Sequence, residues 1–264
     1  MAPDATPAED RALLVAAAEA AGRVALELRG RHGEVVEKPG GQGPVTEADL
    51  AVNEVLKTRL LEARPAYGWL SEEDPDGPER LGAARVFLLD PIDGTRAYID
   101  GRPDFAVAIA VVEAGRVTAG VVHLPARAET YAAHLGGGAT LGAAPIAASR
   151  RDVLDGASAT GARSQYRAEH WPGGAPDIRP EFRPSIAWRI CLVASGRYDM
   201  MVTFRDAWEW DIAAASLIAA EAGAIVTDAM GRPLVFNSTE RRVPGVIAAA
   251  PGLHAEIVAR RGGA

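Results

Sequence analysis

Two aspartates stand three positions apart in the segment Asp90-Pro-Ile-Asp-Gly-Thr95, which follows a short apolar run. Carboxylates at the end of a buried strand need cationic partners, because burying an unpaired charge is very costly. Mg²⁺ binds oxygen ligands and few protein carboxylates per ion, so it suits this pair. Gly94 lets the backbone approach a ligand closely, and a helix beginning at Thr95 would offer free N–H groups to an anion. The segment therefore indicates phosphoryl chemistry, with an ordinary Asp-Pro and Asp-Gly turn as the alternative.

Three other motifs for cations or phosphates do not fit the spacing. An EF-hand loop starting at Asp90 would need an acid at its twelfth position, which is Gly101. A P-loop needs Lys directly after the second Gly of G-x-x-x-x-G-K, and no Gly of this chain is followed by Lys. An aspartyl-nucleophile phosphatase of the D-x-D-G-T type has one residue between its acids, whereas two residues separate Asp90 from Asp93.

Further acidic residues could complete such a site. Glu72 and Glu73 lie in Leu-Ser-Glu-Glu-Asp, shortly before the apolar run, and the alternative is a solvated acidic loop. Asp211 opens a long apolar helix, where the alternative role is that of an N-cap. The pair Thr46-x-x-Asp49 matches a capping box, which needs no catalytic role to explain it.

Helices and strands alternate around these acids. Apolar periodicity predicts helices over residues 13–28, 46–64, 190–194, 211–222 and 254–261, and strands over residues 85–90, 105–112, 117–122, 129–133, 224–227 and 246–250. No internal repeat is visible. The mixture of helices, hairpins and buried strands predicts an α+β or layered α/β architecture, with a boundary near residues 135–150.

The composition is that of a globular protein. The chain has 264 residues, 48% of them hydrophobic and 24% charged, so it can bury a substantial core. Its net charge of −7 argues against a nucleic-acid polymer as partner, because such polymers are bound by clustered Lys and Arg. Cys191 is the one cysteine, which excludes an intramolecular disulfide and favours a reducing compartment. The N-terminal residues do not resemble an export signal, and the longest apolar run, 105–112, is far shorter than the ~20 residues of a membrane helix. We therefore expect a cytoplasmic protein.

Together, the motifs resemble the inositol monophosphatase superfamily of Mg²⁺-dependent, Li⁺-sensitive phosphatases. In chain order they are Lys38 with Val45-Thr-Glu-Ala-Asp49, Ser71-Glu-Glu73, Asp90-Pro-Ile-Asp-Gly-Thr95, Cys191-Leu-Val-Ala-Ser-Gly196, Trp210-Asp-Ile-Ala-Ala214 and Glu221-Ala-Gly223. The resemblance runs from about Ala12 to Ala250, and the combination of D-P-I-D-G-T with W-D-x-A-A is highly specific. It implies the layered αβαβα sandwich of the inositol monophosphatase and fructose-1,6-bisphosphatase type. Residues 1–145 would form an N-terminal half with most metal ligands, and residues 146–264 a C-terminal half with Asp211 and the specificity segments.

The resemblance also implies a site for two to three Mg²⁺ ions. The ligands would be Glu72, Asp90 and the Ile92 carbonyl for the first ion, Asp90, Asp93 and Asp211 for the second, and Glu72 for a third. Mn²⁺ is an alternative ion, whereas Li⁺ or Ca²⁺ would inhibit. Gly94 and Thr95 would donate hydrogen bonds to the phosphate. Thr95 with Asp49 would orient and deprotonate a metal-activated water, with Glu72 as a further catalytic residue.

The expected substrate contacts beside the phosphate are Asp93, Ser185, Arg189 and Asp211. Two segments depart from the family pattern. Ser71 replaces the usual Gly before the glutamates, a small change that we expect to be tolerated. Pro184-Ser185-Ile186 stands where the family has G-[ST]-A, and a hydroxyl in the region of Ser164 is a further candidate contact.

The same resemblance reduces the number of substrates that we expect. Inositol-preferring members carry a Glu several residues before W-D, and residues 203–205 contain none. Loss of a buried acceptor weakens polyol binding by ~1–3 kcal/mol, so a strict inositol enzyme is disfavoured. The tract Glu209-Trp-Asp-Ile-Ala-Ala is instead similar to the bacterial 3′(2′),5′-bisphosphate nucleotidases. Arg189 suits a second phosphate, and Trp188 and Phe204 would offer an apolar face to adenine. The alternative is that Trp188 belongs to the core and Arg189 is a surface cation.

Three functions remain open at this point. The first is a Mg²⁺-dependent nucleotidase that converts 3′-phosphoadenosine 5′-phosphate to AMP. The second is an inositol-1-phosphate or broad sugar-phosphate phosphatase, and the third is a catalytically idle metal-binding protein. The expected partner is a small phosphate ester and neither a nucleic-acid polymer nor a membrane. Because family members are often homodimers, a homodimer is also expected.

Overall fold

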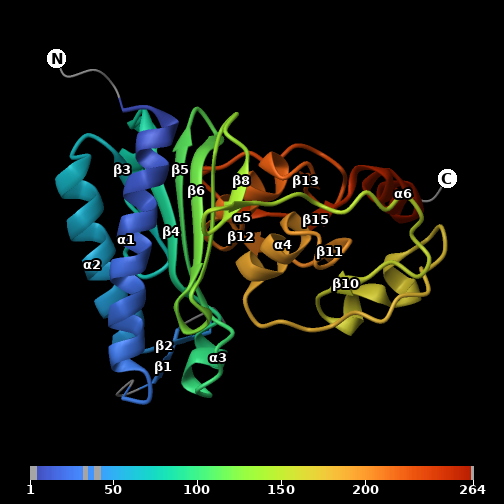
Figure 1. Ribbon diagram of the computed structural model, residues 1–264, viewed down its shortest axis with the longest axis horizontal. Coiled ribbons are helices and arrows are strands. Elements are labelled where there is room, and N and C mark those ends of the chain that lie inside the picture. The colour runs from blue at the N-terminus through green and yellow to red at the C-terminus, as the bar shows by residue number, and fades with distance from the viewer. Residues whose placement is uncertain (1–4, 32–34, 39–42, 263–264) are drawn as a thin grey trace.

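Six helices and two main sheets make up the computed structural model, which describes residues 5–31, 35–38 and 43–262 (Figure 1). The helices are α1 (Pro7–Leu28), α2 (Glu47–Ala63), α3 (Thr95–Ile99), α4 (Ile186–Ala194), α5 (Glu209–Glu221) and α6 (Pro251–Gly262). The large sheet contains, in spatial order, β3 (Gly68–Ser71), β4 (Arg85–Asp93), β5 (Ala106–Glu113), β6 (Arg116–Leu124), β7 (Glu129–His134), β8 (Ala139–Leu141) and β9 (Ala144–Pro145). The small sheet contains β10 (Ala159–Thr160), β11 (Met200–Thr203), β15 (Val246–Ala249) and β13 (Ile225–Thr227). Two short pairs join β1 (Val36–Glu37) to β2 (Pro44–Val45) and β12 (Ala207–Trp208) to β14 (Arg242–Val243).

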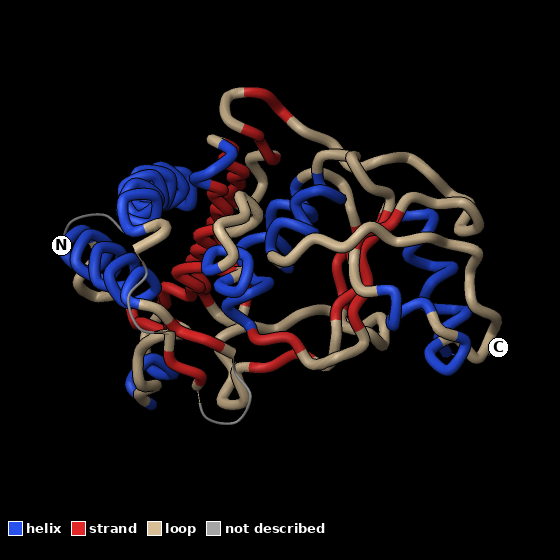
Figure 2. Tube along the Cα trace, turned by 90° about the horizontal axis from the view of Figure 1, so that it is seen from below, coloured by secondary structure: helices blue, strands red, loops and turns tan. Residues whose placement is uncertain are grey.

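These elements form five layers. Helices α1 and α2 cover one face of the large sheet, and α4 and α5 cover the other (Figures 1 and 2). The small sheet lies on the far side of α4 and α5, and α6 packs against β15. The predicted αβαβα sandwich is thereby confirmed.

The central strands have apolar side chains on both faces because both faces are covered. In β4, Phe87 and Leu89 pack toward α1 and α2, while Val86 and Leu88 pack toward α4 and α5. A strand buried on both sides therefore appears in the sequence as a continuous apolar run instead of an alternating one. This explains why the runs 85–90, 105–112 and 117–122 predicted β4, β5 and β6 well.

Helix α5 is the middle layer, and it is buried over almost its whole length. It packs closely on β6, where Gly120 faces the helix. A Cβ atom on Gly120 would lie 2.8 Å from the carbonyl oxygen of Ala214, which is far too close. The absence of a side chain at this position therefore sets the distance between α5 and the large sheet.

The end of β4 differs from the prediction. The sequence predicted a strand that breaks into a turn after Asp90, but β4 continues to Asp93. Asp90 pairs with Ala108 and Asp93 with Ala106, so the register shifts between the two acids. Such a β-bulge bends the strand and re-aims its side chains. The turn prediction was wrong because β5 continues to pair with this segment despite its turn-forming dipeptides.

Four helix starts also differ from their predicted positions. Helix α1 begins at Pro7 instead of residue 13, after a capping box formed by Thr6 and Glu9. Helix α4 begins at Ile186, where the Ser185 hydroxyl accepts a hydrogen bond from the Trp188 N–H. Helix α6 starts at position 251, earlier than predicted. Side-chain caps or a helix-opening Pro account for these three starts, since the apolar pattern alone does not mark first turns.

Helix α5 begins at Glu209 with Trp208 as its N-cap residue and without a side-chain capping hydrogen bond. Asp211 is therefore the third helical residue and not the N-cap.

The predicted division after residue 145 falls at the end of β9. The apolar core between the large sheet and α4 and α5 joins residues from both sides of that position, and the division into two halves stays a prediction. Among the described helices, none combines the length and the apolar character needed to cross a membrane.

Candidate metal and phosphate site

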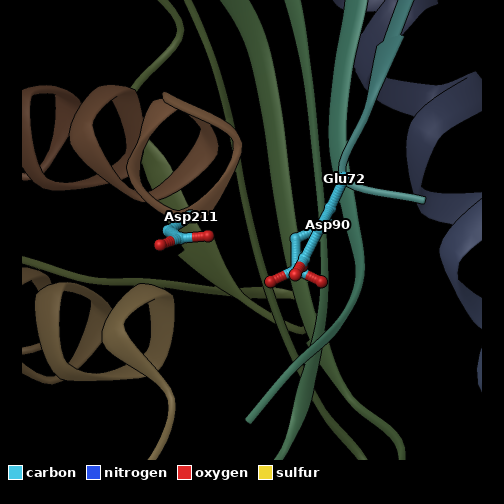
Figure 3. A group of neighbouring side chains, drawn as sticks. All are labelled: Glu72, Asp90 and Asp211. Atoms are coloured by element: carbon cyan, nitrogen blue, oxygen red, sulfur yellow. The ribbon is translucent and has the colours of Figure 1, made fainter. Parts of the chain in front are cut away.

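Three carboxylates from distant parts of the chain converge at the edge of the large sheet that faces α5. Glu72 follows β3, Asp90 lies near the end of β4, and Asp211 is in the first turn of α5 (Figure 3). One ligand oxygen from each lies within 4.8 Å of those of the other two. Figure 3 shows Glu72 and Asp90 side by side, with Asp211 reaching toward them from the helix. The predicted convergence of these acids is present.

The mutual repulsion of Glu72, Asp90 and Asp211 favours binding of a cation. Asp90 is buried, and its burial, followed by repulsion from Glu72, Asp93 and Asp211, raises its pKa well above the usual value. Burial and repulsion from Asp93 and Glu72 likewise raise the pKa of Asp211. Oxygen ligands that repel one another in a buried site are the donor set that hard divalent cations prefer. The residues present therefore fit Mg²⁺.

The bulge contains Ile92, whose carbonyl is the predicted backbone ligand. The Ile92 N–H donates to Asp90 Oδ1 at 2.9 Å, which fixes the orientation of that carboxylate. The Ile92 carbonyl lies 3.1 Å from the Thr95 hydroxyl, whose one hydrogen has this oxygen and Asp49 Oδ1 as alternative acceptors, and Ile92 lines the same cavity as the acids. The carbonyl is thus placed beside the carboxylates, and its role as a ligand stays a prediction.

Lys38 forms ion pairs with both Glu72 and Glu73. Its Nζ lies 2.7 Å from Glu72 Oε1 and 2.7 Å from Glu73 Oε1. Burial alone would lower the pKa of Lys38, but attraction to the two glutamates raises it overall. Burial and repulsion from Glu72 raise the pKa of Glu73 to about 7. The ammonium group therefore neutralises Glu72 and Glu73 in part, whereas Asp90 and Asp211 form no ion pair with it.

Asp93 is engaged differently from the other acids. Its Oδ2 accepts hydrogen bonds from the Ser185 hydroxyl at 2.6 Å and the Ala187 N–H at 2.7 Å, at the start of α4. Burial raises the pKa of Asp93 to about 6, and these hydrogen bonds oppose the rise. Asp93 lines the cavity but lies outside the close group of three acids. Ser185 also caps α4, so its hydroxyl already has two partners.

Thr95 and Asp49 form the predicted hydroxyl–carboxylate pair. Thr95 is the first residue of α3, and its hydroxyl lies 3.2 Å from Asp49 Oδ1. Asp49 Oδ2 accepts from the N–H and the hydroxyl of Thr46 at 2.8 and 2.6 Å, so the capping box holds the carboxylate. Burial raises the pKa of Asp49. One carboxylate therefore both caps α2 and meets Thr95, and the two interpretations of this motif are compatible.

Gly94 allows the sharp entry into α3. Its φ of 101° lies in the left-handed region, and an added Cβ would lie 3.1 Å from the Asp104 carbonyl oxygen. A larger residue would be strained in this conformation and crowded against the neighbouring loop. The start of α3 is thereby held next to the acids.

A cavity of about 390 Å³ joins these groups. Its lining includes the acids Glu72, Asp90, Asp93, Asp100 and Asp211, the helix start with Gly94 and Thr95, the cations Arg96 and Arg102, and the aromatic residues Phe182 and Trp208. The sequence motifs did not identify the four cavity residues Arg96, Arg102, Phe182 and Trp208. For Trp208 a signal existed, since it lies three positions before Asp211 in the same tract.

Of the two rings predicted to contact adenine, Phe204 lies away from the site. It packs against Trp171 beyond the small sheet and does not line the cavity. Its prediction was wrong because the sequence does not tell which layer the ring packs against. Trp188 is only 3% exposed and does not line this cavity either. It lines a neighbouring cavity that shares Arg102 and Phe182 with the first, so its contact with adenine stays a prediction.

Arg189 is neither a free surface cation nor a lining residue of the cavity. Its Nε donates to the Ser185 carbonyl at 3.2 Å, and its guanidinium lies 5.6 Å from the ring centre of Phe182. Burial lowers the pKa of Arg189, and the nearby Asp93 and Asp211 oppose this effect. The surface-cation alternative was therefore wrong, and binding of a second phosphate by Arg189 stays a prediction.

Comparison with known proteins agrees with the geometry. Residues 7–262 match the sequence pattern of the inositol monophosphatase family. The chain is 34% identical to an inositol-1-monophosphatase of Rhizobium meliloti, over 86% of this chain and 90% of that protein. It is 32% identical to the 3′(2′),5′-bisphosphate nucleotidase CysQ of Shigella flexneri, over 78% of this chain and 85% of that protein.

A solved structure of an inositol monophosphatase from Zymomonas mobilis superposes with a TM-score of 0.80 at 28% identity, covering 98% of this chain and all of that one. Relatives with different named substrates are thus about equally similar to this chain, so similarity alone does not determine the substrate. The fold, the converging acids and the match along nearly the whole chain lead to one conclusion: this chain belongs to the inositol monophosphatase family and is a phosphatase acting on phosphomonoesters.

Proposed function

We propose that this protein is a Mg²⁺-dependent phosphomonoesterase that converts 3′-phosphoadenosine 5′-phosphate to AMP. The observation that carries the phosphatase assignment is the convergence of Glu72, Asp90 and Asp211 beside the Thr95–Asp49 pair. Carboxylates that repel one another attract the metal, and a hydroxyl bonded to a carboxylate is a route for a proton.

Each residue of the site has a separate role in hydrolysis of the phosphate ester. Bound Mg²⁺ would neutralise phosphate oxygens and make water a stronger nucleophile. Asp49, fixed by Thr46, accepts the hydrogen of the Thr95 hydroxyl, and that hydroxyl in turn accepts a hydrogen from the attacking water. The water oxygen forms the new P–O bond while the bond to the ester oxygen breaks, and the alcohol leaves with a proton from solvent. Gly94 and Thr95, at the start of α3, hold the phosphate in line.

The nucleotide preference rests on the walls of the cavity. Phe182 is 54% exposed and offers a ring face to a base, and Arg96 and Arg102 offer guanidinium groups to a second phosphate. Both faces of the Trp208 ring are covered, one by Trp210 and the other by the Arg242 guanidinium. A cyclic polyol would instead need a carboxylate acceptor, which residues 203–205 do not supply. The likeness to the CysQ nucleotidase supports the same choice.

A phosphate-release assay with two substrates tests this proposal. We expect kcat/KM for 3′-phosphoadenosine 5′-phosphate to exceed that for inositol 1-phosphate at least tenfold, with release that depends on Mg²⁺. Phe182→Ala should lower kcat/KM for the nucleotide by about tenfold, because stacking on one ring contributes ~1–3 kcal/mol. It should change the inositol ester little. Phe204→Ala is the matched control, because this ring lies outside the cavity and should alter both substrates alike.

An inositol-1-phosphate or broad sugar-phosphate phosphatase is the second candidate, supported by the likeness to the Rhizobium meliloti enzyme. Equal or better use of inositol 1-phosphate, with no selective effect of Phe182→Ala, would favour it. Release equal to a protein-free blank with both esters would instead favour a catalytically idle metal-binding protein.

We further propose that two to three Mg²⁺ ions bind per site, that Mn²⁺ substitutes, and that Li⁺ and Ca²⁺ inhibit. A cytoplasmic location and a homodimer are part of the same proposal. Metal titration with the inhibitors added in turn tests the first statement, and light scattering on the purified chain tests the dimer.

A further inference from the structure

A second, partly buried charge cluster links the segment after Glu72 to the start of α5, and its Arg241 lies 5.9 Å from the ring centre of the cavity residue Trp208. It comprises Asp76, Arg80, Glu209, Asn237, Ser238 and Arg241. Arg80 comes from the segment between Glu72 and Asp90, and it is 3% exposed. Glu209 is fully buried and is the first residue of α5, two positions before Asp211.

Arg80 uses its whole guanidinium group within this cluster. Nε and one terminal nitrogen bind the two oxygens of Asp76 at 2.6 and 3.0 Å. The terminal nitrogens also donate to Asn237 Oδ1 at 2.6 Å and to the Ser238 carbonyl at 2.9 Å. A planar fork with this many fixed partners holds its neighbours in a defined geometry.

Glu209 binds the same two residues from the other side. Its carboxylate accepts from the N–H groups of Asn237 and Ser238 at 2.6 and 3.1 Å, and from the Ser238 hydroxyl. The Glu209 N–H donates to the Arg241 carbonyl at 2.9 Å. The loop 237–241 is therefore held between Arg80 on the sheet side and Glu209 at the start of α5.

The charges of the cluster balance. Asp76 lies against both Arg80 and Arg241, and Glu209 supplies the second negative charge. No external cation is needed here, in contrast to the three acids nearby. Because Arg80 and Glu209 are buried, a balanced network around them is costly to break at either residue and rigid when complete.

We propose that Arg80 and Glu209 are positioning residues for the metal site: acting through loop 237–241, they fix the start of α5 so that Asp211 stands at the correct distance from Glu72 and Asp90. This inference rests on the metal-dependent function proposed above. A merely structural cluster would lower stability without changing metal affinity, whereas a positioning cluster changes metal affinity in a folded protein.

The test is a titration of the full-length protein with Mn²⁺ alone, in which electron paramagnetic resonance measures the free ion. Arg80→Lys keeps the charge but loses the fork, and Ser238→Ala removes one donor to Glu209. We expect the Kd for Mn²⁺ to rise about tenfold in Arg80→Lys and about threefold in Ser238→Ala. The rise in Tm on adding Mn²⁺ should shrink in the same order.

Asp10→Asn is the control, because Asp10 is an equally buried acid whose partners, Arg64 and Tyr67, lie away from the cavity. It should lower Tm and leave the Kd for Mn²⁺ unchanged. Variants that fold with lowered Tm and bind Mn²⁺ as wild type does would overturn the positioning role. If Arg80→Lys does not fold, Ser238→Ala decides between the same two outcomes. Failure of wild type to bind Mn²⁺ would instead overturn the proposed metal site itself.

Discussion

Two buried acids, Asp10 on α1 and Asp90 on β4, lie near opposite ends of strand β4 in opposite electrostatic surroundings. Near its start, Asp10 accepts hydrogen bonds from Arg64 Nε at 3.0 Å and the Tyr67 hydroxyl at 2.9 Å, and Arg85 lies 3.9 Å away. Near its end, Asp90 has other carboxylates as its main charged neighbours. The first acid is satisfied by the chain itself and has a structural role. The second group is left for a cation from solution, which is how burial distinguishes a stabilising acid from a binding site.

The largest effect that would test this contrast is on catalysis. Asp90→Asn removes a charge that the metal needs and should lower kcat/KM by at least ~10²- to 10³-fold. Asp10→Asn should leave kcat/KM within about twofold, because it lies outside the cavity. Steady-state phosphate release measures both, with circular dichroism to establish folding. A fully active, folded Asp90→Asn protein would contradict the site.

The next largest effect concerns the proton route. Thr95→Ala should lower kcat by about 10²-fold, because it removes the hydroxyl that links water to Asp49. Thr95→Ser should keep most activity. Because burial raises the pKa of Asp49, activity in wild type should fall as pH drops toward a value above the usual range of an aspartate. A pH profile of kcat/KM without such an acid limb would count against Asp49 as the proton acceptor.

The smallest effect concerns stability. Burial raises the pKa values of Asp90 and Asp211, that of Asp93 to about 6 and that of Glu73 to about 7. Groups with raised native pKa values stabilise the fold below their unfolded pKa values, near 4, and lose this contribution as pH rises through the native values. The Tm of metal-free protein should therefore fall by several degrees between about pH 4 and pH 8.

Saturating Mg²⁺ should reduce that fall, because the ion binds the ionised acids and only the folded protein assembles them. Calorimetry with and without the ion measures the difference. An identical pH dependence in both conditions would mean that the acids do not act as one metal-binding group.

Much of this architecture was predictable from local patterns. The runs that form β4, β5 and β6 are apolar on both faces, and the Asp90-to-Thr95 segment has a spacing that few other sites share. The capping box at Thr46 was also predictable from the sequence, because its two partners are three residues apart. Each of these features depends on neighbours in the sequence.

Features set by distant contacts were not predictable. The bulge in β4 depends on its register with β5, and the burial of Trp188 depends on which layer covers α4. Phe182 and Trp208 line the cavity because separate loops end beside it, and no spacing rule brings them together. Two of the partners of Arg80, Asn237 and Ser238, lie more than 150 positions away in the sequence. A sequence pattern identifies such residues only after the fold has placed them.

The absence of a side chain at Gly120 limits which substitutions this protein tolerates. Gly120 touches no ligand, yet it contacts Ala214, one helical turn beyond Asp211. A methyl group there would displace the helix that carries the acid, so even alanine should be rejected under selection for activity. Mutational tolerance is therefore low at a position in the middle of a strand, and a library screened for turnover should retain glycine at 120 as strictly as the carboxylates themselves.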